Sequence, residues 1–229
     1  QKTTRLYLVR HGATQLSAED RFAGSIDPEL SETGIYQAQR LAERLADDEI
    51  STVYCSPMIR TIQTATILAK PHDIIPIQRD GLREINHGHW EGCLRGEVEQ
   101  LYPEEYAAWE EDPFTFAPQG GEAGVNVIAR ALPVIREIVV NHPGQNVIVV
   151  THKATLRLLI SSILGFDARG YRDRLDQSPA ALNVVDLKDP VRARLMLFND
   201  VSHYKDQPAR SDGRLSKWWD TNTSNGSAA

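Results

Sequence analysis

The chain has 229 residues, 41% of them hydrophobic, and 31 acidic against 25 basic residues give it a formal net charge of −6 at pH 7. This balance excludes nucleic acid as the main partner, because a polyphosphate backbone needs a basic face. No apolar run approaches the length of a membrane span, and the two cysteines, Cys55 and Cys93, are too few for a disulfide framework. We therefore expect a cytoplasmic protein with reduced thiols, without a signal peptide and without membrane contact.

The first apolar run, residues 6–9, predicts a buried strand that ends in Arg10, His11 and Gly12. Open α/β sheets bind ligands at the carboxyl ends of their strands. Arginine offers a planar fork to an oxyanion, and a neutral imidazole can act as a nucleophile near pH 7. Glycine lets the backbone turn sharply beside a ligand. The strand end is therefore a candidate site.

The next elements repeat this arrangement. Helical spacing of apolar residues predicts a helix over 32–46, and a short strand follows at 51–55. Ser56 and Pro57 predict the N-cap and the first position of another helix. Arg60 then lies in the first turn of that helix, where backbone amides also favour an anion.

A short strand is predicted at 74–78, and a loop rich in glycine, histidine and aromatic residues follows at 81–92. Residues 96–111 have the pattern of an acidic helix, and prolines then break the regularity. We interpret residues 88–123 as an insertion over the ligand-binding edge of the sheet.

A long helix is predicted over 125–138, in which Pro133 predicts a kink or a late break. The unbroken apolar run 146–150 predicts a buried strand that ends at His152, so a second histidine stands at a strand end. Another helix is predicted from Thr155 to a glycine stop after Leu164.

Residues 181–198 predict an antiparallel hairpin, whose edge offers a surface for pairing in a homodimer. His203 is expected on the surface. We predict one domain over 1–204 and a polar C-terminal tail over 205–229, in which Trp218–Trp219 suggest docking.

The pattern places four side chains at one edge of one sheet, namely Arg10, His11, Arg60 and His152. Two guanidinium groups, two imidazoles and helix-end amides suit a tetrahedral dianion. One histidine can attack phosphorus in line while the other groups hold the equatorial oxygens. Glu84 is the best candidate for the proton donor to the leaving oxygen. We expect neither metal nor cofactor, because the arginines supply the positive charge.

Over about residues 5–200 the chain resembles the histidine phosphatase superfamily, which is phosphoglycerate-mutase-like. The matching segments, in chain order, are Leu-Val-Arg-His-Gly-x-Thr at 8–14, Leu-Ser-Glu-x-Gly-x-x-Gln-Ala at 30–38, Cys-Ser-Pro-x-x-Arg-x-x-Gln-Thr-Ala at 55–65, Leu-x-Glu-x-x-x-Gly-x-Trp-Glu-Gly at 82–92, Gly-Gly-Glu at 120–122 and Val-Val-Thr-His at 149–152.

The resemblance implies an α/β fold, a three-layer α/β/α sandwich with a helical insertion over the active-site edge. It implies that His11 is the phosphohistidine nucleophile and that Glu84 is the general acid and then the base. Arg10, Arg60 and His152 are implied to bind the phosphate.

Two departures concern the phosphate site: Ala13 stands where the family often has glutamate, and Ser17 where it often has a phosphate-binding asparagine. A serine hydroxyl can still donate a hydrogen bond. Mutases of the family carry basic residues in the insertion, whereas residues 109–113 here are acidic. A strongly anionic substrate would be repelled there, which favours a phosphatase over a mutase.

Segments at 27–32, 83–90, 102–104 and 116–122 resemble the metal-independent phosphoserine phosphatases. In that interpretation His87 either recognises the carboxylate of the substrate or only shapes its loop. The other candidate substrate-binding residues are Ser17, Ala23, Gly24 and Lys153.

The predicted function is thus hydrolysis of a small phosphorylated metabolite, a phosphoserine or a sugar or glycerate phosphate, through a phosphohistidine. Two alternatives stay open, a phosphoglycerate-type mutase and a non-catalytic sensor of a phosphorylated ligand. The intact set of nucleophile, acid and anion-binding residues argues against the sensor. Dinucleotide binding is excluded because no Gly-x-Gly-x-x-Gly follows a strand.

Overall fold

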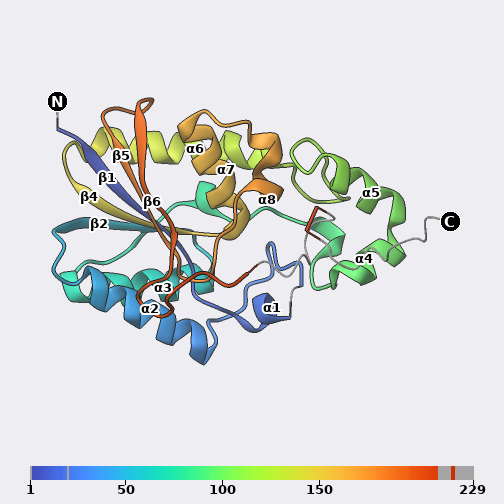
Figure 1. Ribbon diagram of the computed structural model, residues 1–229, viewed down its shortest axis with the longest axis horizontal. Helices are drawn as coiled ribbons and strands as arrows, with labels where there is room; N and C mark the ends of the chain where they lie inside the picture. The colour runs from blue at the N-terminus through green and yellow to red at the C-terminus, as the bar shows by residue number, and fades with distance from the viewer. Residues whose placement is uncertain (1, 20, 211–217, 220–229) are drawn as a thin grey trace.

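The computed structural model describes residues 2–19, 21–210 and 218–219, and within them one mixed sheet lies between two layers of helices (Figure 1). The strands of the described part, in the spatial order β3-β2-β4-β1-β5-β6, are β1 (Thr4–Arg10), β2 (Ile50–Cys55), β3 (Ile77–Gln78), β4 (Asn146–Thr151), β5 (Leu182–Leu187) and β6 (Ala193–Asp200).

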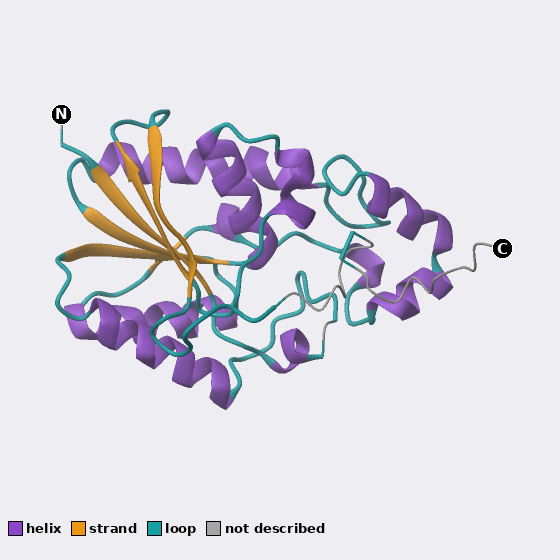
Figure 2. Cartoon of the chain, viewed as in Figure 1, coloured by secondary structure: helices purple, strands orange, loops and turns teal. Residues whose placement is uncertain are grey.

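The helices α2 and α3 cover one face of the sheet, and α6 and α7 cover the other (Figure 2). The helices of the described part are α1 (Gln15–Ala18), α2 (Glu32–Leu45), α3 (Ile59–Ala69), α4 (Arg95–Leu101), α5 (Pro103–Glu111), α6 (Gly124–Asn141), α7 (Lys153–Leu164) and α8 (Tyr171–Arg174). The predicted three-layer α/β/α architecture is confirmed.

Side chains of β1 alternate between the two faces of the sheet and contribute to a hydrophobic core on each face. Leu6 and Leu8 are fully buried against the layer of α6 and α7. Tyr7 and Val9 point the other way and pack with residues of α2 and α3. Successive side chains of a strand face opposite sides of the sheet, and covering both faces explains the continuous apolar run.

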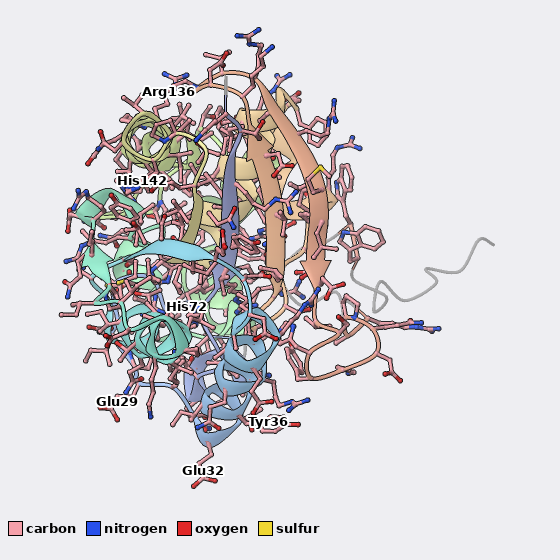
Figure 3. All side chains as sticks on the ribbon, turned by 90° about the vertical axis from the view of Figure 1, so that its left-hand side faces the viewer. Glu29, Glu32, Tyr36, His72, Arg136 and His142 are labelled. Atoms are coloured by element: carbon pink, nitrogen blue, oxygen red, sulfur yellow. The ribbon has the colours of Figure 1, made fainter. Side chains whose placement is uncertain are left out.

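The outer face of α2 is polar, and Glu32 and Tyr36 point away from the body of the protein (Figure 3). The inner face carries Ala38 and Leu41, both fully buried, so the helix packs along one apolar stripe.

Parallel pairing of β1, β4 and β2 brings their carboxyl ends to the same edge. Val9 pairs with Val150, and Val150 pairs in turn with Cys55. The residues that follow these strands therefore meet in one crevice. On the other side β5 runs antiparallel to β1 and β6 antiparallel to β5, which confirms the predicted hairpin.

Three local predictions are wrong in detail. The N-cap of α3 is Met58 and not Ser56, whose hydroxyl lies 2.8 Å from Nε2 of His152 instead. The helix predicted over 96–111 is two helices, because Pro103 cannot continue α4 and instead opens α5. The strand predicted at 74–78 has only the residues of β3.

Pro133 does not break α6, which continues to Asn141. The proline lies on the exposed side of the helix, whereas Ala131, Ile135 and Ile138 are buried against the sheet. Burial of that apolar face outweighs the one hydrogen bond that a proline removes.

The insertion forms its own small core beyond the carboxyl ends of the strands, where α4 and α5 lie in Figure 1. Trp90 is fully buried in this core, and its Nε1 donates to Glu105 at 2.9 Å. Trp109 packs edge-on against Trp90 with ring centroids 5.7 Å apart. The insertion is thus held rigidly beside the crevice.

The two C-terminal tryptophans contact α8. Nε1 of Trp219 donates to the carbonyl of Asp173 at 2.9 Å, and the guanidinium of Arg174 lies 5.3 Å from the Trp218 ring centre. The docking suggested for these residues thus takes place on α8. Residues 211–217 and 220–229 of the predicted tail lie outside the described residues.

His203 is buried, contrary to the predicted surface position, because its Nε2 donates to the carbonyl of Ala180 at 2.9 Å. Burial lowers the pKa of His203 to about 4. The folded state therefore keeps this imidazole neutral at pH values where an unfolded chain protonates it, which happens below about 6.5. Its contribution to stability is present above that pH and is lost as the pH falls toward 4.

We expect the free energy of unfolding to decrease between pH 6.5 and 4.5, and part of that decrease to disappear in His203→Gln. Glutamine can still donate to the Ala180 carbonyl but does not titrate. Urea unfolding at a series of pH values measures the slope for both proteins. Identical slopes would show that His203 titrates normally in the folded protein.

Candidate active site

The structure brings together the four side chains that the sequence placed at one edge. His11 follows β1, His152 follows β4, and Arg60 lies in the first turn of α3. The two histidine rings meet edge to face with centroids 5.3 Å apart. A cavity of about 400 Å³ opens here, and Arg10, His11, Arg60 and Glu84 line it, whereas His152 is fully buried. His142 precedes β4 and His72 follows α3, so both lie at the opposite end of the sheet from these residues.

The hydrogen bond at Nδ1 fixes the tautomer of His11. Nδ1 lies 2.7 Å from the carbonyl oxygen of Gly12, which can only accept, so Nδ1 carries the proton. Nε2 then keeps a free lone pair. Burial, followed by the positive charges of Arg60 and Arg10, holds the pKa of His11 well below its usual value. The imidazole is neutral and nucleophilic at neutral pH.

Close backbone packing explains why glycine follows the histidine. A Cβ on Gly12 would stand 2.4 Å from the carbonyl oxygen of Gly34, so the turn after β1 accepts no side chain. The amide of Gly12 also donates to Thr64 on α3 at 3.1 Å. The turn is thereby fixed to both neighbouring elements of the site.

Two buried arginines supply positive charge beside His11. Arg10 donates to the carbonyl of Gln177 at 2.5 Å, and its buried Nε has no partner among the described residues. Arg60 donates to the carbonyls of Gly24 and Ile26. Burial lowers the pKa of Arg10 to about 10 and that of Arg60 in the same direction, so both stay cationic at neutral pH. Such a pair suits a dianion.

His152 is held by one hydrogen bond. Its Nε2 lies 2.8 Å from the Ser56 hydroxyl, and its buried Nδ1 has no partner in the part of the chain that the structure describes. Burial, then the charge of Arg60 and the nearby His11, keeps its pKa well below the usual value. The Ser56 hydroxyl thus positions the His152 ring, and it is not the N-cap that the sequence predicts.

Glu84 lies over the N-terminus of α7. Its oxygens accept from the amides of Ala154 and Thr155, each at 3.1 Å. Its loop is fixed by Arg130, which donates to the carbonyl of Glu84 and to the carboxylate of Glu122. The Glu122 of the Gly-Gly-Glu motif therefore acts on the site indirectly, by holding this loop.

All five predicted substrate-binding residues line the cavity, namely Ser17, Ala23, Gly24, His87 and Lys153. The Ser17 hydroxyl is already engaged, because it donates to the carbonyl of Thr14 at 2.9 Å. Burial lowers the pKa of His87, whose ring packs against Phe22. Lys153 lies 2.9 Å from a carboxylate oxygen of Asp176.

Sequence reasoning missed several basic side chains that also line the cavity, namely Arg21, Arg157, Arg172 and Arg210. The four-residue spacing between Lys153 and Arg157 was the available signal, because it places both on one helix face. The other three depend on how separate segments pack together.

Two carboxylates of the acidic stretch 109–113 are engaged by neighbouring residues. Glu110 faces Arg172, with Oε2 3.8 Å from Nη2. Asp112 accepts hydrogen bonds from the backbone amides of Phe114 and Thr115. Neither carboxylate lines the cavity, so neither would contact a ligand there, and the expected repulsion of a strongly anionic substrate stays a prediction.

A neutral imidazole beside buried arginines at the carboxyl end of a strand is the arrangement of enzymes that transfer phosphoryl groups through histidine. Residues 6–201 match the family described as the histidine phosphatase superfamily (branch 1), and the chain belongs to that superfamily.

Relatives of known name agree with this membership. The chain is 37% identical over 163 residues to phosphoserine phosphatase 1 of Hydrogenobacter thermophilus, covering 71% of this chain and 77% of the relative. It is 33% identical over 204 residues to phosphoglycerate mutase-like protein 4 of Arabidopsis thaliana, covering 88% and 87%. The solved structure of a mycobacterial glucosyl-3-phosphoglycerate phosphatase superposes with a TM-score of 0.79 at 28% identity, covering 86% and 99%. The chain is a phosphatase of this superfamily.

Across the described ranges, no helix is both long and apolar enough to cross a membrane. The same residues contain no group of three or more histidine, cysteine or acidic side chains placed to hold a metal ion.

Proposed function

We propose that the chain hydrolyses a small phosphomonoester through a phosphohistidine on His11, without a metal ion. The observation that carries the proposal is the fixed tautomer of His11, which leaves the Nε2 lone pair available in a residue that lines the same cavity as Arg10 and Arg60. The names of the relatives, which act on phosphoserine and glucosyl-3-phosphoglycerate, support an ester of this size.

In the first step Nε2 of His11 attacks phosphorus in line with the ester oxygen. The N–P bond forms as the P–O bond breaks, and Glu84 gives its proton to the leaving oxygen. Arg10 and Arg60 bind the other phosphate oxygens and offset their charge, and the neutral His152 adds a hydrogen bond.

In the second step water attacks the phosphohistidine from the side that the alcohol has left. The carboxylate of Glu84 takes a proton from that water, the N–P bond breaks, and inorganic phosphate leaves. His11 returns to its neutral form and Glu84 to its protonated form, so the cycle closes.

The test is phosphate release, with a chelator present, from phosphoserine, 3-phosphoglycerate, a fructose bisphosphate and an aryl phosphate. We expect release from at least one metabolite and from the aryl ester. Phosphate that stays on an organic product and needs a bisphosphate for turnover would instead indicate the mutase. Binding of phosphate without release from any ester would indicate the sensor.

Four further statements stay predictions. They are a cytoplasmic location, the absence of nucleic-acid partners, one domain over 1–204 followed by a tail, and pairing of two chains through the hairpin. Support for the last is that β6 is an outermost strand of the sheet in the described part of the chain, and an edge strand can pair with a strand of another chain.

A further inference from the structure

Lys153 and Arg157 add positive charge to the cavity beyond the two arginines beside His11. The two residues stand four positions apart on α7 and both line the cavity. About one helical turn separates them, a rise of about 6 Å, so both side chains extend from the same face of the helix. The first turn of this helix also holds Glu84, the proposed acid, through the amides of Ala154 and Thr155.

Arg157 is a buried cation without a close counterion. Only 7% of the residue is exposed, and no carboxylate lies within 4.0 Å of it among the described residues. Its Nη1 donates to the carbonyls of Arg172 and Leu175, while its buried Nε has no partner there. Burying an uncompensated guanidinium is unfavourable unless a ligand brings the missing negative charge.

Lys153 is only partly neutralised. Its Nζ lies 2.9 Å from Asp176, yet burial and the charges of Arg157 and Arg10 lower its pKa to about 8. The side chain is still mainly an ammonium group at pH 7. Together with Asp176 the two cations leave one net positive charge, which matches one carboxylate.

The neighbouring candidates fit an anion less well. Arg172 is engaged by the carbonyl of Trp109 at 2.9 Å and by Asp173 at 3.2 Å. His87 is held neutral, because burial lowers its pKa, and a neutral imidazole attracts a carboxylate only weakly.

We propose that Lys153 and Arg157 bind a carboxylate on the leaving group, which makes the substrate a phosphorylated hydroxy acid or hydroxy amino acid. This inference rests on the proposed function, since it takes the phosphate to lie at His11. In this proposal the charged pair on α7, and not His87, binds the carboxylate of the substrate.

The experiment compares esters that differ only in the carboxylate. One pair is phosphoserine and phosphoethanolamine, and the other is 3-phosphoglycerate and glycerol 3-phosphate. For at least one pair we expect kcat/KM to be about ten- to a hundredfold higher for the carboxylate-bearing member, as for one or two charge-assisted hydrogen bonds.

In Lys153→Met the ratio of the two kcat/KM values within a pair is expected to fall toward one, mainly through a higher KM for the carboxylate-bearing ester. Lys153→Arg is expected to keep most of the preference. Lys70→Met is the matched control, because it removes the same charge from an exposed position at the far end of α3. The variant Lys153→Met/Asp176→Asn also removes the carboxylate that pairs with Lys153, so Arg157 again stands as one uncompensated cation, and part of the preference is expected to return.

Equal kcat/KM values within both pairs for the wild type would overturn the inference, as would a preference that survives Lys153→Met undiminished. These outcomes leave phosphate release by the wild type intact. Failure of the proposed function has a different signature, which is no phosphate release from any of the four esters.

Discussion

Replacement of His11 by alanine is expected to lower the rate of phosphate release by about four to six orders of magnitude, the size of loss seen when a covalent nucleophile is removed. The structure offers no substitute at that position. His152 is fully buried, and its Nε2 is engaged by Ser56. Phosphate release from a carboxylate-bearing ester and from an aryl phosphate measures the loss.

His72→Ala is the matched control, because this histidine follows the last turn of α3, away from the first turn that carries Arg60, and does not line the cavity. It is expected to keep the wild-type rate. Thermal unfolding shows whether His11→Ala is folded. A folded His11→Ala protein that keeps more than a few per cent of the activity would contradict the proposed nucleophile.

Replacement of Glu84 by glutamine is expected to act according to the leaving group. Proton transfer by a positioned acid contributes about 10²–10⁴-fold, so release from an alkyl ester should fall by that factor. An aryl phosphate with an acidic phenol needs no proton in the first step, and its cleavage should fall far less. Because the second step still needs the base, the variant should release a burst of phenol equal to the enzyme concentration and then slow down.

Rapid-mixing measurements with both esters separate these steps. Glu137→Gln is the matched control, since this carboxylate lies on α6 and pairs with Arg79. Equal losses on the alkyl and the aryl ester, without a burst, would remove Glu84 from the chemical steps and leave it a residue that holds its loop against α7.

The centre of the site could be predicted because local patterns place its parts. A strand followed by Arg10 and His11 is encoded in consecutive residues, and so are the strand before His152 and the helix start at Arg60. Parallel strands between helices then bring those ends together.

The remainder depends on packing between distant segments. Ser56 has the sequence of a helix cap, but its hydroxyl faces His152. Arg157 becomes a buried cation only because α8 and the loop after it cover α7. Glu110 belongs to an acidic run in the sequence, but in the folded protein it faces Arg172. None of these pairings has a spacing that a sequence displays.

The most direct test of the account is to trap the phosphoenzyme. The wild-type protein is mixed with excess ester and quenched in base within a few milliseconds. It is then digested, and the masses of its peptides are measured by mass spectrometry. We expect the mass of one HPO₃ group on the peptide that contains His11, formed and lost at rates compatible with turnover. Phosphate on a different residue, or steady release without any phosphorylated peptide, would contradict the central claim.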